Sequence, residues 1–157
     1  MDITLTDFLI GFSSALDLLS PDSGHRGVRR AFIAINIARQ RRLSLLAQKR
    51  LFIAALLRDI SRGAHAPQDC ARRLAEIPLL ADSASLITAR EQQHQESRLL
   101  DLADNLDLLA LHEYPRGQYP TYAVETLCDS IGCRYLLDDI LALRELGLDN
   151  AFWAELA

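Results

Sequence analysis

The residue types that most often bind metal ions or attack substrates are sparse in this chain, which has three Cys and four His among 157 residues. Cys70, Cys128 and Cys133 are odd in number, and their spacing fits neither a disulfide framework nor a zinc site. We therefore expect reduced thiols, as in a cytoplasmic protein. His25 and His65 fall in segments expected to be exposed loops.

A second chemical feature is a basic cluster between residues 39 and 50, at the expected turn between two helices. Its members are Arg39, Arg41, Arg42, Lys49 and Arg50. Such a cluster forms either a solvated face or a docking site for an anionic partner. We do not expect nucleic acid as that partner, because aromatic residues make up only 6% of the chain and its later part is acidic.

The net charge of −4 conceals a strongly uneven distribution of charge. Residues 26–73 carry eleven Arg and Lys49 against Asp59 and Asp69, a net charge of +10. Residues 74–157 carry five Arg against fifteen acidic residues, a net charge of −10. This asymmetry indicates either charge matching within the folded domain or across a dimer, or an anionic partner.

Length and composition limit the classes of protein to which the chain can belong. A chain of 157 residues with 50% hydrophobic and 24% charged residues is typical of one soluble globular domain, here residues 1–157. The longest apolar run, residues 51–57, is far shorter than the roughly 18 residues of a membrane span, so no membrane contact is expected. The start, residues 1–4, lacks the basic region of a secretory signal.

The elements that must position these residues are helical nearly throughout, so we predict an all-α fold, a compact multi-helix bundle. Apolar residues recur at three- and four-residue spacing over Leu5–Leu19, and Pro21 ends this helix. Residues 29–39 form a helix that is apolar on nearly every face. The next helix is capped by Ser44, runs through residues 51–57 and is equally apolar. These two helices are expected to pack against each other at the centre.

Shorter helices are expected in the rest of the chain, separated by a loop at residues 114–120. The predicted ranges are 67 to about 76, a short helix from Ser83 or Ser85, 95–111, 121 to about 130, and 134–146. Gly147 is expected to end the last of these in a left-handed conformation. Asp149 is expected to cap a final turn whose Phe152 and Trp153 pack against the bundle.

Ile53–Ile60 reads IAALLRDI, an apolar segment that ends in an Arg-Asp pair. It resembles the motif AALLHDIG of the HD superfamily of metal-dependent phosphohydrolases, in which an apolar helix ends in a His-Asp pair. Arg29–Arg39 resembles the preceding family helix, RVAYIAYRIA, and Leu100–Asp107 resembles the later LADRVD motif. Leu16–Pro21 resembles the lead-in of bacterial HD and HD-GYP-like proteins, and residues 151–156 are similar to the end of the first HD half in longer ones. The resemblance implies an HD-type helical bundle. It allows two origins for the chain, a stand-alone HD domain or the first half of a longer HD-GYP-type protein.

The resemblance also implies where a family site would lie. In the family, a His-Asp pair, a His from the preceding helix and an Asp from a later helix bind a divalent ion, which polarises a phosphoryl oxygen and activates water. In this chain the position of the paired His holds Arg58, followed by Asp59. The position of the first His holds Arg26, and Asp104 matches the last ligand. His25 is one residue away from the first His position and would point about 100° away on a helix.

Two Arg and two Asp favour ion pairing over metal binding at this site. Arg58 is a permanent cation that cannot ligate a metal and repels one. We expect Arg58 to pair with Asp104 in the vacated metal position and Arg26 to pair with Asp59, because an unpaired buried charge is costly. These four residues are therefore predicted to form a vestigial or ligand-binding site without a catalytic residue.

Three functions follow from these expectations. The favoured hypothesis is a degenerate, non-catalytic HD domain that needs no cofactor and serves as a regulatory or interaction module in bacterial signalling, with a protein partner or a second copy. A rival hypothesis is a phosphohydrolase of nucleotides or cyclic dinucleotides, with His25, Asp59 and Asp104 around one divalent metal. A third is a sensor in which Arg26 and Arg58 bind a phosphate-containing small ligand.

Overall fold

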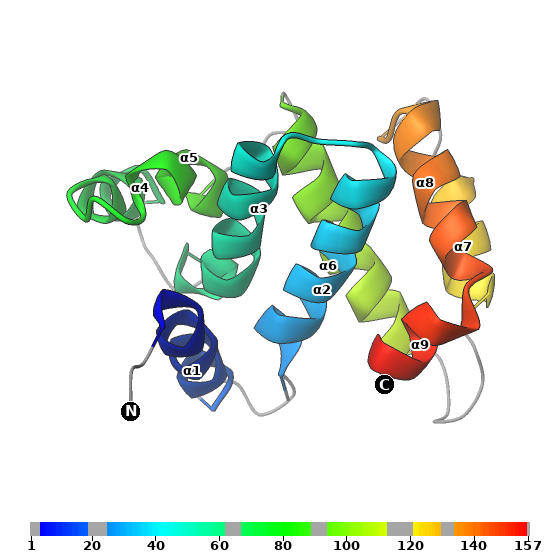
Figure 1. Cartoon of the computed structure of the whole chain (residues 1–157), viewed down its shortest axis with the longest axis horizontal. Coiled ribbons are helices and arrows are strands. Elements are labelled where there is room, and N and C mark those ends of the chain that lie inside the picture. Colours follow the sequence, from blue (N-terminus) through cyan, green and yellow to red (C-terminus); the bar gives the residue numbers. More distant parts are fainter. Residues whose placement is uncertain are drawn as a thin grey trace.

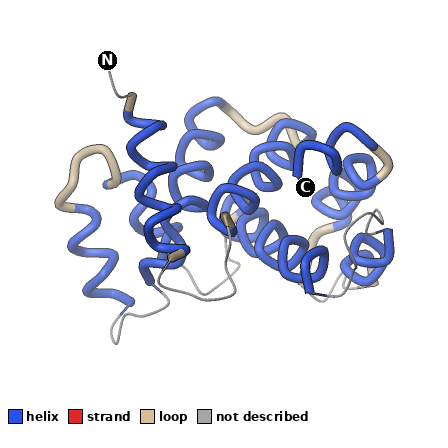
Figure 2. Tube along the Cα trace, turned by 90° about the horizontal axis from the view of Figure 1, so that it is seen from below, coloured by secondary structure: helices blue, strands red, loops and turns tan. Residues whose placement is uncertain are grey.

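The computed structural model describes residues 4–18, 25–61, 67–88, 94–112, 121–129 and 134–156. Within these ranges it contains nine α-helices, one 3-10 turn and no strand, so the all-α prediction is confirmed (Figure 2). The predicted loop at 114–120, His65 and Cys133 lie outside the described residues.

The helices of the described ranges extend from residue 5 to residue 156. In chain order they are α1 (Leu5–Asp17), α2 (Arg26–Gln40), α3 (Leu45–Leu57), the 3-10 turn η1 (Arg58–Ser61), α4 (Pro67–Ala75), α5 (Ala81–Thr88), α6 (Gln95–His112), α7 (Thr121–Cys128), α8 (Leu137–Gly147) and α9 (Asn150–Leu156). No helix in the described ranges has the length and the apolar character needed to cross a lipid bilayer.

Helices α2 and α3 form the centre of the bundle, as predicted. They lie side by side, with α6 packed behind them (Figure 1). Helix α1 packs against both, α5 packs against α3 with α4 on its outer side, and α7, α8 and α9 lie on the side of α2 and α6 (Figure 1). Fully buried side chains of this core include Ile33 and Ile37 on α2, Leu51 and Leu56 on α3, and Leu102 on α6. Their burial follows from the nearly continuous apolar surface of α2 and α3.

Several predicted helix ends are confirmed. The side chain of Ser44 caps α3 and accepts a hydrogen bond from the backbone N–H of Ala47 at 3.2 Å. Helix α4 begins at Pro67, and Asp149 accepts a bond from the N–H of Ala151 at the start of α9 at 2.8 Å. Helix α5 starts at Ala81, before the two Ser residues proposed as its start.

The predicted left-handed stop at Gly147 is wrong. Helix α8 begins at Leu137, includes Gly147, and is followed by Leu148 in the right-handed region, with φ −86°. A Cβ atom at residue 147 would lie 2.9 Å from Cγ2 of Val124 on α7. The glycine therefore permits the close approach of α7 and α8 and has no role as a left-handed cap. Phe152 and Trp153 are buried against the bundle, as predicted.

Helix α1 is anchored to the centre by a similar close approach. Ser13 is buried, and its hydroxyl donates a hydrogen bond to the carbonyl of Leu56 at 3.0 Å. The bond passes directly over Gly27 at the start of α2, where a Cβ atom would lie 2.0 Å from Oγ of Ser13. The side chain at residue 27 must therefore be hydrogen, because anything larger would displace the Ser13 hydroxyl.

Candidate functional site

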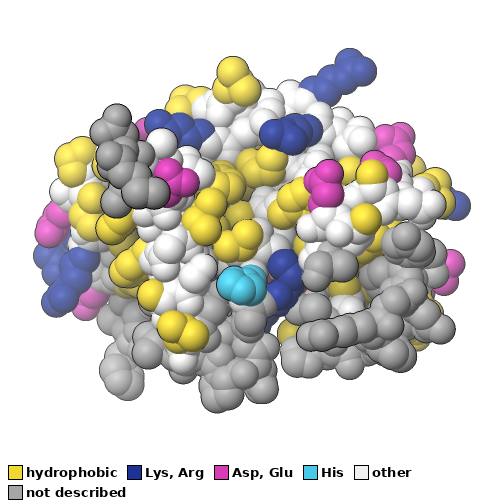
Figure 3. Space-filling view, turned by 60° about the horizontal axis from the view of Figure 1, so that its bottom comes forward, with side chains coloured by type: hydrophobic (Ala, Val, Ile, Leu, Met, Phe, Trp, Pro, Cys, Tyr) yellow, Lys and Arg dark blue, Asp and Glu magenta, His cyan; other side chains and the backbone are white. Residues whose placement is uncertain are grey.

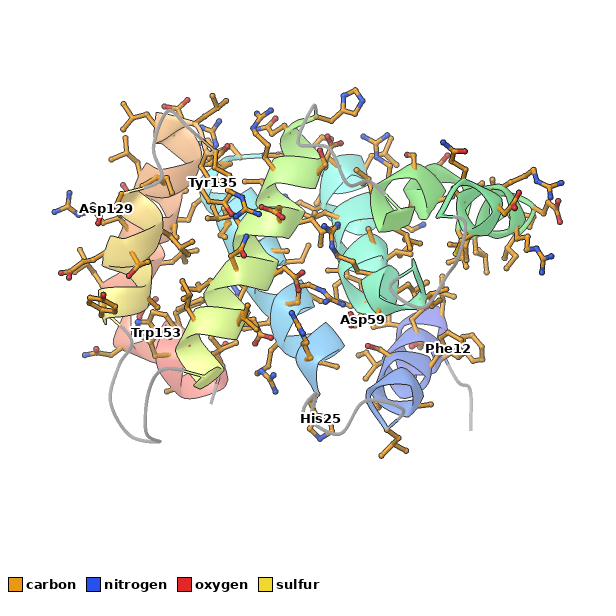
Figure 4. All side chains as sticks on the ribbon, turned by 180° about the vertical axis from the view of Figure 1, so that it is seen from behind. Phe12, His25, Asp59, Asp129, Tyr135 and Trp153 are labelled. Carbon is orange, nitrogen blue, oxygen red and sulfur yellow. The ribbon has the colours of Figure 1, made fainter. Side chains whose placement is uncertain are left out.

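A fully buried arginine lies where α2, α3 and α6 meet. The side chain of Arg30 is 0% exposed. Its Nε donates to the carbonyl of Ala55 at 2.8 Å, its Nη2 donates to Oδ2 of Asp59 at 2.8 Å, and its Nη1 donates to Oδ1 of Asp104 at 3.0 Å. Figure 4 places Asp59 at the end of α3, next to α2. One guanidinium group thus bridges two carboxylates that come from different elements.

The electrostatic environment keeps Arg30 charged. Burial alone would lower the pKa of its guanidinium, but the hydrogen bonds and charges of Asp59 and Asp104 outweigh burial and raise the pKa above its ordinary value. Arg30 is therefore a fixed cation, and two carboxylates accept hydrogen bonds from it.

The structure brings together all four residues predicted from the sequence, with a different pairing. Nε of Arg58 lies 3.8 Å from Oδ2 of Asp104, so the expected pair is present. Arg26 does not pair with Asp59; its Nη2 lies 3.2 Å from Oδ1 of Asp104. The reason is that Arg26 and Arg30 lie one turn apart on the same face of α2, and Arg30 occupies the position next to Asp59.

A second carboxylate on α6 extends the network. Nε of Arg29 donates to Oδ1 of Asp107 at 2.8 Å, and Nε of Arg26 lies 3.8 Å from Oδ2 of the same group. Burial raises the pKa of the Asp107 carboxyl above its ordinary value, and the nearby arginines offset part of that rise.

We call these residues the charged cluster. It consists of Arg26, Arg29, Arg30, Arg58, Asp59, Asp104 and Asp107. Its cations come from the basic middle of the sequence, and Asp104 and Asp107 come from the acidic later part. Part of the charge asymmetry is therefore matched inside the fold.

Arg29, Arg30 and Asp107 were not among the residues expected at the site. The sequence does hold a signal for Arg30. The HD motif RVAYIAYRIA, which this helix resembles, has an apolar Val at the position where this chain has a charged Arg. Arg30 also lies on the same helical stripe as Ile33 and Ile37, which are core residues. A charged residue on a buried stripe requires a partner, but the sequence alone does not say which acid provides it.

The described residues do not fit a divalent metal at this site. His25 is exposed at the tip of α2, where it has φ 57° and makes no side-chain capping bond (Figure 4). In the described ranges, no three His, Cys, Asp or Glu side chains form a group that could hold a metal ion. The Asp59 and Asp104 carboxylates are instead bridged by the guanidinium of Arg30, which has no lone pair to offer.

The basic cluster between residues 39 and 50 is split by the fold. Nε of Arg41 lies 3.0 Å from Oδ1 of the buried Asp139, and Arg50 pairs with Glu96. Arg39 and Lys49, together with Arg42, are exposed. Two members of the cluster are thus bound to the acidic part of the chain, and the other three face solvent.

Comparisons of this chain with protein-family models, with curated proteins and with solved structures found no match. The chemistry of the charged cluster is that of neutralisation, because each of its carboxylates has an Arg nitrogen within ion-pair distance. Such an arrangement fixes helices relative to one another, and its fixed cations could also meet an anion.

Proposed function

We propose that this chain is a non-catalytic domain of the HD type that serves as a regulatory or interaction module in bacterial signalling. The observation that carries the proposal is the buried Arg30 between Asp59 and Asp104. The resemblance to the HD superfamily makes those two Asp the counterparts of metal ligands. In this chain an organic cation supplies the positive charge between them.

The chemistry of that substitution argues against hydrolysis. A guanidinium group neutralises carboxylates as a metal does, but it has no vacant coordination position and cannot lower the pKa of a bound water. The counterparts of two family His ligands are also cations, Arg26 and Arg58. A domain that keeps the helical scaffold and replaces the ligands in this way acts by presenting a surface.

A metal-content measurement tests the proposal. The wild-type chain, purified without chelator, is expected to carry no stoichiometric divalent metal. The triple variant Arg26→His, Arg30→Val, Arg58→His returns the site to the family pattern and is expected to gain metal, whereas Arg58→His alone is not, because Arg30 still bridges the two carboxylates. A matched control is Arg39→His, Arg72→His, Arg73→Val, which also adds two imidazoles and removes three Arg, but at exposed positions.

Two outcomes would contradict the proposal in different directions. Stoichiometric metal in the wild-type protein that is lost in Asp59→Ala would favour the phosphohydrolase. A rise in melting temperature with millimolar nucleotide that is lost in Arg26→Gln would favour the sensor of a phosphate-containing ligand.

A further inference from the structure

A groove with apolar walls runs between α2 and α3. Its volume is about 430 Å³. The apolar walls include Val28, Phe32 and Ile35 from α2 and Phe52 from α3. Figure 3 shows hydrophobic side chains gathered in a hollow at the middle of one face, with basic and acidic side chains around it.

The groove and the charged cluster lie on different faces of α2. Arg26 and Arg30 are one turn apart on the face that meets Asp104, whereas Val28, Phe32 and Ile35 follow a separate stripe at helical spacing. A change in the groove therefore leaves the ion pairs of the cluster intact.

The aromatic wall of the groove is held in place by the fold. The Phe32 ring stacks on the Phe152 ring of α9, with 5.5 Å between the ring centroids and 19° between the ring planes. Phe32 and Phe52 are both half-buried and pack against the core, so they present rigid apolar surface to the groove. Ile35 lines the groove and is not among the residues that pack against the core.

One end of the groove is positively charged. Arg39, near the end of α2, and Lys49, near the start of α3, both line it and are exposed. Across the ranges that the structure describes, neither side chain makes an ion pair, whereas their neighbours Arg41 and Arg50 are paired with acids. An acidic group at this end of the groove could therefore pair with Arg39 and Lys49 without breaking an existing ion pair.

We propose that the groove between α2 and α3 docks an amphipathic helix of a protein partner, whose apolar face packs on Phe32, Ile35 and Phe52 and whose acidic side chains pair with Arg39 and Lys49. Charge complementarity selects this occupant, since apolar walls with free cations at one end suit a helix that is apolar along one face and acidic at one end. This inference rests on the proposed function, which needs a surface through which the module acts, and it names that surface and the chemistry of its partner.

A labelled synthetic helix serves as the probe. It has about 18 residues, Leu at helical spacing on one face, and three Glu at either its N-terminal or its C-terminal end. A matched peptide carries Lys in place of Glu. We expect saturable binding of an acidic peptide in fluorescence anisotropy, and at least about tenfold weaker binding of the Lys peptide.

Variants of the groove locate the binding. Arg39→Glu with Lys49→Glu is expected to weaken binding of the acidic peptide by about tenfold or more, because two attractions become repulsions. Ile35→Glu is expected to weaken it similarly. The control Arg72→Glu with Arg73→Glu changes the net charge equally on exposed α4 positions and should leave affinity within about twofold. In NMR spectra, the backbone amide chemical shifts that change when the acidic peptide is added should belong to residues that line the groove.

The outcomes separate this proposal from its rivals. Absence of saturable binding, equal binding of both peptides, or equal weakening by the α4 control would overturn it. A concentration-dependent dimer of the wild-type chain that the Arg39→Glu, Lys49→Glu variant loses would make a second copy the occupant and would also overturn it. Stoichiometric metal in the wild-type chain together with normal binding of the acidic peptide would reject the proposed function alone. A metal-free wild-type chain that does not bind the acidic peptide would reject only the groove proposal.

Discussion

Arg30 and Asp104 are 74 residues apart in the sequence, and their Nη1 and Oδ1 atoms are 3.0 Å apart in the fold. The same guanidinium reaches Asp59 through Nη2, so the end of α3 and the middle of α6 are tied to one point on α2. The Arg30 side chain is fully buried, so its donor groups do not meet bulk water, whereas Asp59 and Asp104 keep 21% and 15% of their side chains exposed. A single side chain therefore links all three elements, in addition to their shared apolar core.

Arg30→Met is expected to lower the free energy of unfolding by about 3 kcal/mol, because it leaves partly buried carboxylates without their main cation. This loss lies at the low end of the range for breaking a buried ion pair, because Asp104 still has the Arg26 guanidinium at 3.2 Å. Urea unfolding provides the measurement. The exposed control Arg39→Met should change stability by less than about 0.5 kcal/mol.

Adding Asp59→Asn to Arg30→Met should restore part of that stability, because the neutral amide does not need the cation that Arg30 supplied, while Asp104 keeps its charge for Arg26 and Arg58. A double variant less stable than Arg30→Met alone would show that other cations chiefly hold the Asp59 carboxylate.

Adjacent residues on α8 should differ sharply in their contributions to stability. The Asp139 side chain is 0% exposed and pairs with both Arg41 and Arg98, whereas Asp138 is 67% exposed and pairs with Arg41 alone. Asp139→Asn should cost about 2–3 kcal/mol and Asp138→Asn less than about 0.5 kcal/mol. Both lie in the first turn of α8, so dipole effects cancel in the comparison. Similar losses in thermal unfolding would argue against the buried linkage.

Gly27→Ala should destabilise the protein by about 2 kcal/mol, because the new Cβ would displace the Ser13 hydroxyl from its bond to Leu56. The sign is informative, since helix propensity alone would favour Ala by about 1 kcal/mol. In a Ser13→Ala background the cost should shrink, which a double-mutant cycle measures. Gly11→Ala on α1, where a Cβ meets nothing within 4 Å, should stabilise and serves as the control. A stabilising Gly27→Ala would refute the close approach.

Tyr135 should make the protein sensitive to alkali. Its hydroxyl donates to Oδ2 of Asp101 at 2.9 Å and accepts from Asn105 at 2.7 Å. Burial, together with the charge of Asp101, raises the pKa of Tyr135 above the ordinary 10.0. Above that ordinary value the folded state keeps a proton that the unfolded state loses, so stability should fall as pH rises.

The measurement for Tyr135 is the free energy of unfolding between about pH 7 and pH 11 for the wild-type chain and Tyr135→Phe. The variant should lose about 1–2 kcal/mol at neutral pH through its missing hydrogen bonds, and should show a flatter decline in alkali. Parallel declines in the two proteins would mean that another group titrates.

Most of the helices could be predicted from local features of the sequence. Ser44, Pro67 and Asp149 mark helix starts through hydrogen bonds or backbone angles that involve only neighbouring residues, so they could be recognised without the fold. Gly147 was misjudged because its role depends on Val124, a residue of another helix.

Residue types and order by themselves determined an all-α fold with α2 and α3 at its centre, and a set of charges in which a basic middle precedes an acidic later part. The resemblance to the HD motifs brought Arg26, Arg58, Asp59 and Asp104 forward as one site. The tertiary structure alone decided that Arg30 bridges Asp59 and Asp104 and that Arg26 turns to α6. The physical reason is that an ion pair forms between atoms a few ångströms apart, and for residues on separate helices that distance is set by how the helices pack and rotate, which no local pattern encodes.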